Sequence, residues 1–196
     1  MRLAITIMVI AIVACLACPS FAGNNPTAKA AVHVRAHNAK LGCNVTIGSC
    51  VDIVTTEAGF SVDAFPIFYE LTEFLGVQYG LTWPAWAYSA AFQNCSDLVI
   101  GAVSTPGTGA AHTWTACQTG IAIPSFVWLY ADGPGYICLS DYPDSDPPGF
   151  YVLDCAEGLD TPEWAICGGV NGAVGDDACN PATEAATWSE IKKIFK

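Results

Sequence analysis

Three aspartates beside a proline-rich turn are the first residues whose types and spacing fit a known chemistry. Asp141, Asp144 and Asp146 lie within six residues of one another in the stretch DYPDSDPP. Ca²⁺ is held by several oxygen ligands, often carboxylates, from flexible loops of this kind. The spacing matches no EF-hand, and the alternative is an acidic loop in contact with water. We therefore expect a candidate calcium site here and no other cofactor.

A second group of residues offers flat rings for stacking. Trp83, Trp86 and Tyr88 fall within six residues, in what looks like the end of a strand and the following loop. Exposed rings of this kind stack on sugar faces, whereas core packing beneath a loop is the more common role of tryptophan. A carbohydrate-binding role is the alternative that this segment raises, with Trp86 and Tyr88 as the expected contacts.

Catalytic patterns are weak in this chain. His112 is the single histidine of the acidic body, and no G-x-S-x-G pattern accompanies it. His33 and His37 are four residues apart, about 13 Å along a strand at roughly 3.3 Å per residue, which is too far to share a metal. Acidic residues are abundant, so a small secreted glycoside hydrolase with a carboxylate pair stays an alternative. We assign no catalytic residues.

The distribution of charge excludes one class of partner. Between Leu41 and Thr187 there are seventeen Asp or Glu residues and no Lys or Arg, and the formal net charge is −11. A surface of this sign repels nucleic acid and other anionic surfaces. Its carboxylates are either solvated or neutralised by cations or by a basic partner.

Residues 1–22 have the organisation of a signal peptide. Arg2 is followed by an uncharged apolar stretch and by small residues at the −3 and −1 positions before Gly23. We expect cleavage after Ala22 and a secreted, extracellular or cell-surface protein with no membrane span after cleavage. An uncleaved anchor and lipidation at Cys15 are the alternatives.

Eight cysteines follow the expected cleavage site, an even number that indicates four disulfides in an oxidising compartment. No two of them have the C-x-x-C spacing of zinc or redox sites. Pairing of nearest neighbours, 43–50, 95–117, 138–155 and 167–179, is the simplest arrangement among the many that eight cysteines allow. The cysteines are Cys43, Cys50, Cys95, Cys117, Cys138, Cys155, Cys167 and Cys179.

Short apolar runs separated by turn residues predict an all-β domain over 23–156. Residues 30–37 alternate as in a half-buried strand, and Pro66 is expected at an edge or a bulge. Together the runs favour a disulfide-stapled antiparallel β-sandwich. The expected strands are 30–37, 62–70, 74–83, 97–103, 111–117, 121–130, 135–140 and 149–155.

The C-terminal part of the chain differs from this domain. Residues 157–182 are rich in Gly and Asp and predict an irregular flap held by disulfides. Residues 183–196 predict a linker and a short basic amphipathic helix, opened by the capping-box pattern of Thr187 to Glu190. This helix either packs on the protein's own sheet or serves as a partner or sorting tail, presenting Trp188, Ile191, Lys192 and Phe195.

The stretch from Ala64 to Trp86, which contains AFPIFYELTEFLGVQYGLTWP, resembles the early strands of cohesin-type β-sandwich domains. The whole chain is also similar to secreted β-sandwich proteins of environmental bacteria. This resemblance implies a non-catalytic adhesion or scaffold role and carries no binding residues across. We therefore expect an extracellular or cell-surface interaction module with a protein or glycan partner, and the sequence leaves its oligomeric state open.

Overall fold

The structure is a computed structural model that describes residues 23–146 and 148–180. The predicted signal peptide (1–22) and the predicted terminal helix lie outside these residues. The elements are β1 (Lys29–Ala36), η1 (Cys50–Asp52), β2 (Thr56–Glu57), β3 (Ser61–Thr82), β4 (Tyr88–Asn94), β5 (Leu98–Gly101), β6 (Gly109–Ala122), β7 (Ser125–Tyr130), β8 (Gly135–Ser140), β9 (Tyr151–Leu153), β10 (Leu159–Asp160), β11 (Ala165–Ile166) and β12 (Gly168–Val170).

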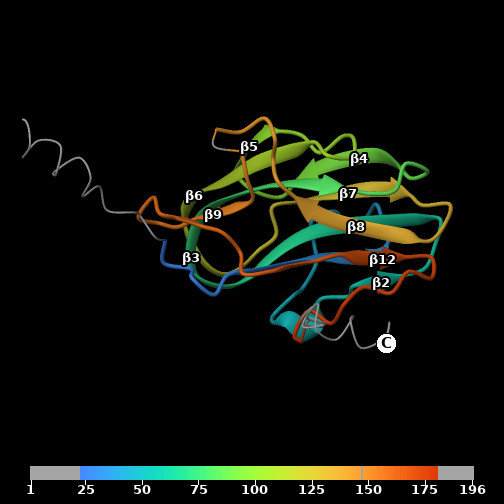
Figure 1. The fold of residues 1–196 in the computed structure, drawn as a ribbon, viewed down its shortest axis with the longest axis horizontal. Helices are drawn as coiled ribbons and strands as arrows, with labels where there is room; N and C mark the ends of the chain where they lie inside the picture. Colours follow the sequence, from blue (N-terminus) through green and yellow to red (C-terminus); the bar gives the residue numbers. More distant parts are fainter. Residues whose placement is uncertain (1–22, 147, 181–196) are drawn as a thin grey trace, which may run out of the picture.

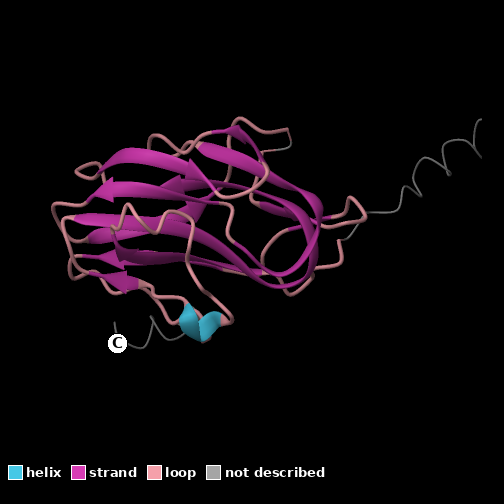
Figure 2. Cartoon of the chain, turned by 180° about the vertical axis from the view of Figure 1, so that it is seen from behind, coloured by secondary structure: helices cyan, strands magenta, loops and turns pink. Residues whose placement is uncertain are grey.

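The predicted all-β class is confirmed. The strands run along the long axis of the molecule (Figure 1), and η1 is a single helical turn at its lower edge (Figure 2). The described residues contain more strands than the seven or eight expected, because β2, β4, β10, β11 and β12 are short or half-exposed and gave no clear apolar run.

The strand β3 organises the fold. The two runs expected at 62–70 and 74–83 form one continuous strand of 22 residues instead. Its first part lies between β1 and β7, and its later part pairs with β6 on one side and with β9 and β8 on the other. Outer strands β4, β5, β11 and β12 extend these two groups.

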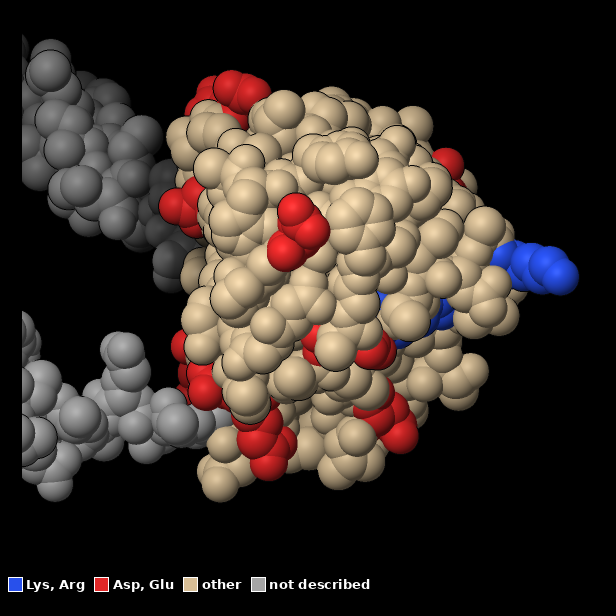
Figure 3. Space-filling model, turned by 90° about the vertical axis from the view of Figure 1, so that its right-hand side faces the viewer, with Lys and Arg blue, Asp and Glu red and all other residues tan. Residues whose placement is uncertain are grey.

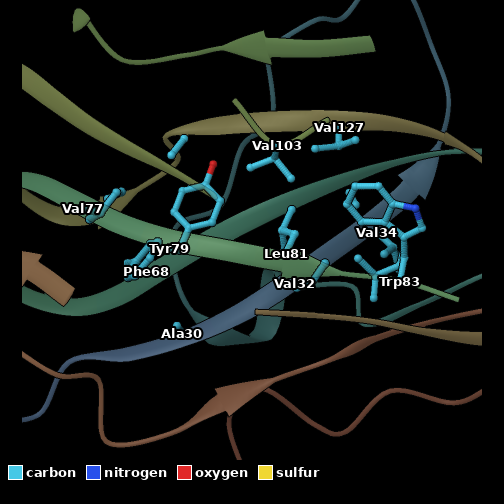
Figure 4. Packing of buried hydrophobic residues seen from close by; sticks show 14 of the residues in the cluster. Ala30, Val32, Val34, Phe68, Val77, Tyr79, Leu81, Trp83, Val103 and Val127 are labelled. Carbon is cyan, nitrogen blue, oxygen red and sulfur yellow. The ribbon is translucent and has the colours of Figure 1, made fainter. Parts of the chain in front are cut away.

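The main core lies between these two groups of strands. Val32 and Val34 of β1 pack in the same buried cluster as Tyr79 and Leu81 of β3 (Figure 4). At about 25 cal/mol per Å² of apolar surface, such burial is the main favourable contribution to folding.

Pro66 lies in the middle of β3, where the strand changes its partner. On one side it is opposite Val32 of β1. On the other side, the pairing with β7 ends at Ala64 and the pairing with β6 begins at Phe68. The proline therefore interrupts no regular ladder on that side, which agrees with the expected irregularity although the strand is internal.

The strand β1 is buried on both faces, so the half-buried reading of residues 30–37 is wrong. A second cluster covers the outer face of β1 and β3, with Ile47 and Ile53 from the loop before β2 and Ala178 from the C-terminal segment. His33 points to this covered side and is buried.

The eight cysteines of the described residues form four disulfides, as expected, but nearest-neighbour pairing is wrong. The bonds are Cys43–Cys95, Cys50–Cys179, Cys117–Cys155 and Cys138–Cys167. Pairing by proximity in the sequence fails because β-sheet partners bring distant segments together. Two of the bonds hold the segment 157–182 to the domain, and three short strands of that segment, β10 to β12, join the sheet.

Candidate functional site

A groove lies on the outer face of the sheet formed by β5, β6, β3 and β9. Its volume is about 400 Å³. Its lining includes Gly76 and Gln78 of β3, Ala111 of β6, and three residues of β9 and β10: Tyr151, Leu153 and Leu159. The lining is mostly apolar, which is typical of binding sites in which a few polar groups set orientation.

The side chains of β5 point alternately inward and outward, and this explains one apolar edge of the groove. Val99 packs against the core, so its neighbours Leu98 and Ile100 face outward. Ile100 is 64% exposed, and Leu159 on the opposite side of the groove is 44% exposed. Gly76 permits the close approach of β3 and β6, because a Cβ there would lie 2.8 Å from the carbonyl oxygen of His112.

The acidic loop after β8 lies along the groove. Tyr142 and Gly149 form an isolated bridge, and the Tyr142 ring occupies the space above Gly109 that a side chain would fill. The Gln78 amide donates to Ser145 Oγ at 2.8 Å and to the Gly149 carbonyl at 3.1 Å. This anchoring brings Asp146 to the groove.

The three aspartates proposed as calcium ligands all belong to this loop and are exposed. Among residues 23–146 and 148–180, one group of three acidic, cysteine or histidine side chains has ligand atoms within 4.8 Å of one another, and it consists of Glu73, Cys117 and Cys155. The loop carboxylates are therefore not gathered for an ion. Calcium binding stays a prediction, which a melting temperature unaffected by millimolar EDTA would contradict.

Beneath the groove, His112 belongs to a buried polar network. Its Nδ1 lies 3.0 Å from Asn94 Oδ1 and its Nε2 lies 3.1 Å from the Tyr79 hydroxyl. Because an amide oxygen only accepts, Nδ1 carries the proton and Tyr79 donates to Nε2. Tyr79 in turn accepts from Ser125.

Burial sets the ionisation of this network. It lowers the pKa of His112 to about 4 and raises the pKa of Tyr79 well above its usual range. Both side chains are therefore neutral at pH 7. Because Ser125 is fully buried, the network connects β3, β4, β6 and β7 rather than presenting a nucleophile to solvent.

A second polar cluster lies on the covered side of β1. The fully buried Asp63 carboxylate accepts from Arg35 Nε at 3.2 Å, and its Oδ1 lies 2.6 Å from His37 Nδ1. His37 stacks on Trp128 with ring centroids 4.0 Å apart. His33 instead accepts the Val54 amide, and burial lowers its pKa to about 4.

The structure separates the three aromatic residues proposed for sugar binding. Trp83 is 6% exposed and belongs to the main core, so it is unavailable to a ligand and its assignment is wrong. It lies inside because β3 continues to Thr82 and carries the following residue inward. Trp86 and Tyr88 remain accessible, at 40% and 59% exposed.

Sequence reasoning missed two rings next to Tyr88. Tyr130 lies directly opposite it on β7, with ring centroids 5.0 Å apart, and Phe60 lies 5.2 Å from Tyr130. The alternation of residues 126–130, with Trp128 and Tyr130 on one face, was the signal available in the sequence. This alternation predicts rings beside Tyr88 only when β4 and β7 are known to be neighbouring strands.

The acidic character found in the sequence extends over the surface. On the face drawn in Figure 3, acidic side chains are scattered widely, whereas basic side chains are confined to one side. Beside the groove, the Asp97 carboxylate accepts from the Thr115 amide and hydroxyl, and these bonds lower the pKa of Asp97. Asp97 is therefore ionised at neutral pH.

Comparison of the fold with solved structures finds cohesin modules. A cohesin module of a family 33 glycoside hydrolase from Clostridium perfringens is 11% identical, with a TM-score of 0.47 over 74% of this chain and 98% of that chain. A type II cohesin domain from the cellulosome of Acetivibrio cellulolyticus is 12% identical, with a TM-score of 0.46 over 75% of this chain and 96% of that chain.

A third solved structure, a complex of CaDoc0917 with CaCohA2 at pH 5.5, gives 13% identity and a TM-score of 0.49 over 74% of this chain and 99% of the matched chain. All three are weak similarities in fold to cohesin modules. No protein-family model matches the chain, and no curated protein matches it by sequence. Among the described residues, no helix is long and apolar enough to cross a membrane.

Proposed function

We propose that this protein is a secreted, non-catalytic interaction module that binds a protein segment in the groove over β5, β6, β3 and β9. The observation that carries the proposal is the exposure of Ile100 and Leu159 on either side of an apolar groove of about 400 Å³. Large apolar side chains gathered around a concavity are a feature of interaction sites.

Charge defines the chemistry of the partner. Asp146 lines the groove and Asp97 lies beside it, next to β5. With no Lys or Arg between Leu41 and Thr187, the domain favours a segment that is both apolar and basic. The chain's own terminal segment, 187–196, has this composition and supplies a ready probe.

Binding is tested with a fluorescent peptide of residues 187–196, titrated against full-length protein that carries Trp188→Ala and Phe195→Ala so that its own tail does not compete. We expect saturable binding that weakens at least about tenfold in Ile100→Asp, because a buried unpaired charge would then face the apolar peptide. Higher salt should also weaken binding.

Two controls sharpen this test. A peptide with its three lysines replaced by glutamate should not bind, and Val51→Asp, which alters an exposed apolar residue outside the groove lining, should leave affinity unchanged. Equal affinity for both peptides, or equal affinity of Ile100→Asp and the parent, would contradict the proposal.

The exposed rings of Trp86 and Tyr88, together with the half-buried ring of Tyr130, support carbohydrate binding as a second candidate function. Tyr88 and Tyr130 present neighbouring ring faces across a strand pair, which suits stacking on pyranose rings. Glycan-array binding that is lost in Tyr88→Ala but kept in Ile100→Asp would favour this alternative. Absence of glycan binding would remove it.

The extracellular setting is also part of the proposal. Four disulfides within one domain persist in an oxidising compartment and are rare in the cytosol. A non-catalytic role predicts no hydrolysis in a polysaccharide screen. Activity lost in a single Asp→Asn or Glu→Gln variant would instead support the glycoside hydrolase alternative.

A further inference from the structure

The residue that follows the expected cleavage site lies directly against a buried carboxylate. A Cβ placed on Gly23 would lie 2.1 Å from Asp160 Oδ2 and 2.7 Å from Oδ1. The Gly23 backbone therefore lies directly against the Asp160 carboxylate. A residue with a side chain at position 23 would displace either the backbone there or the Asp160 carboxylate.

The next two residues are also held by carboxylates. The backbone amide of Asn24 donates to Asp154 Oδ2 at 2.8 Å, and the backbone amide of Asn25 donates to Asp160 Oδ2 at 2.7 Å. The Asn25 side chain donates to the Glu73 carbonyl and accepts from the Thr72 amide. These bonds fix the chain at residues 24 and 25 and so fix the position of Gly23.

The two aspartates differ in how their charge is compensated. Asp154 also accepts the amides of Ala156 and Gly158, so its carboxylate has three backbone donors. Asp160 is only 8% exposed. Among residues 23–146 and 148–180, the Asn25 backbone amide is the one hydrogen-bond donor to its carboxylate, and the ion pairs involve Glu70 or Asp63 instead.

A buried carboxylate without an opposite charge is costly, because burial removes water that would solvate it. Cleavage after Ala22 would place a cation beside Asp160, because Gly23 lies against that carboxylate. Hydrolysis of the Ala22–Gly23 amide adds water across the bond, leaving a carboxylate on Ala22 and an amine on Gly23. That amine takes a proton at neutral pH.

We propose that cleavage after Ala22 creates a binding site for the new N-terminus, in which the Gly23 ammonium pairs with Asp160. Removal of the signal peptide then adds a stabilising contact between the start of the chain and β10. Glycine at position 23 suits both cleavage and pairing. It follows the small residue that the peptidase needs, and its lack of a side chain leaves room for the Asp160 carboxylate.

The proposal is tested with four forms of the protein: the chain starting at Gly23, the same chain N-acetylated, the chain starting at Ala22, and the Asp160→Asn variant of the first. We expect the Gly23 ammonium form to melt about 3 °C or more above the acetylated and extended forms at pH 7. In Asp160→Asn this difference should disappear, because the amide cannot form the ion pair.

Asp132→Asn is the matched control, since it removes an exposed carboxylate from the turn between β7 and β8 and should preserve the difference. Equal melting temperatures of the ammonium and acetylated forms would overturn the proposal. So would an intact mass showing that the protein secreted by its host does not begin at Gly23. Neither result bears on the groove, so failure here is distinguishable from failure of the proposed function.

Discussion

At the scale of single residues, two buried histidines make the stability of this protein sensitive to mild acid. Burial lowers the pKa of both His33 and His112 to about 4, whereas an unfolded chain has a histidine pKa of about 6.5. Between these values the unfolded state binds more protons than the folded state. The contribution of the two neutral histidines to the free energy of unfolding is therefore complete above pH 6.5, and it is lost as the pH falls toward 4.

We predict that the free energy of unfolding falls by about 1 kcal/mol for each histidine between pH 7.5 and pH 5.5. Urea denaturation at several pH values measures this loss. His112→Gln should remove about half of the pH dependence, although it also lowers stability at pH 7. A flat profile in the parent protein would show that the two imidazoles are not buried as described.

The Arg35–Asp63 pair allows a direct comparison between buried and exposed ion pairs. Asp63 is fully buried, and Arg35 also donates to the carbonyls of Asn44 and Gly42. The other pair, Lys29–Glu70, lies 2.6 Å apart with a half-exposed carboxylate. Loss of Arg35 leaves the buried Asp63 carboxylate without its arginine, with His37 Nδ1 as its remaining side-chain partner, whereas loss of Lys29 leaves a solvated carboxylate on Glu70.

Arg35→Gln should therefore cost about 3 kcal/mol or more of unfolding free energy, whereas Lys29→Gln should cost less than about 1 kcal/mol. Chemical denaturation of the two variants at pH 7 measures both values. Similar losses would mean that the Asp63 carboxylate is solvated in the native protein.

At the scale of elements, the apolar pattern of β3 predicts strand structure but not the length of the strand. Its core-facing residues follow a period of two at Val62 and Ala64, then steps of three through Phe68, Leu71 and Phe74 to Val77. Each step of three coincides with a register shift against β6. A strict period of two breaks at such bulges, so the segment looked like two strands joined by a turn.

The disulfides show a second limit of predicting structure from this sequence. The number of bonds follows from counting cysteines, but their connectivity depends on which segments the sheet places side by side. Cys138 of β8 reaches Cys167 because Ile137 and Gly168 are paired in neighbouring strands. That pairing involves a segment with no apolar pattern, so no local rule reveals it.

Mass spectrometry of non-reduced proteolytic peptides should recover four cross-linked pairs, 43–95, 50–179, 117–155 and 138–167. Replacing Cys50 and Cys179 together with serine should cost roughly 2–5 kcal/mol of stability, because it frees the loop and the C-terminal segment that cover the outer face of β1 and β3. A cross-linked peptide joining residues 43 and 50 would contradict this covering arrangement.

At the scale of the whole molecule, the sequence predicted the fold class and the acidic character but not the groove. Ile100 and Leu159 are 59 residues apart and belong to strands of four and two residues, so neither lies in a recognisable pattern. Trp83, which the sequence did highlight, belongs to the core. Chemistry-bearing residue types are visible in a sequence, whereas the burial of each one depends on tertiary packing.

The central claim is that an apolar, basic segment binds in the groove over β5, β6, β3 and β9. The most direct measurement is methyl NMR of isotope-labelled protein carrying Trp188→Ala and Phe195→Ala, titrated with the peptide of residues 187–196. We predict that the methyl signals of Leu98, Ile100 and Leu159 shift together, while those of Ile47 and Ile53 on the covered outer face stay in place. Shifts confined to residues near Trp86 and Tyr88, or no shifts at all, would contradict the account.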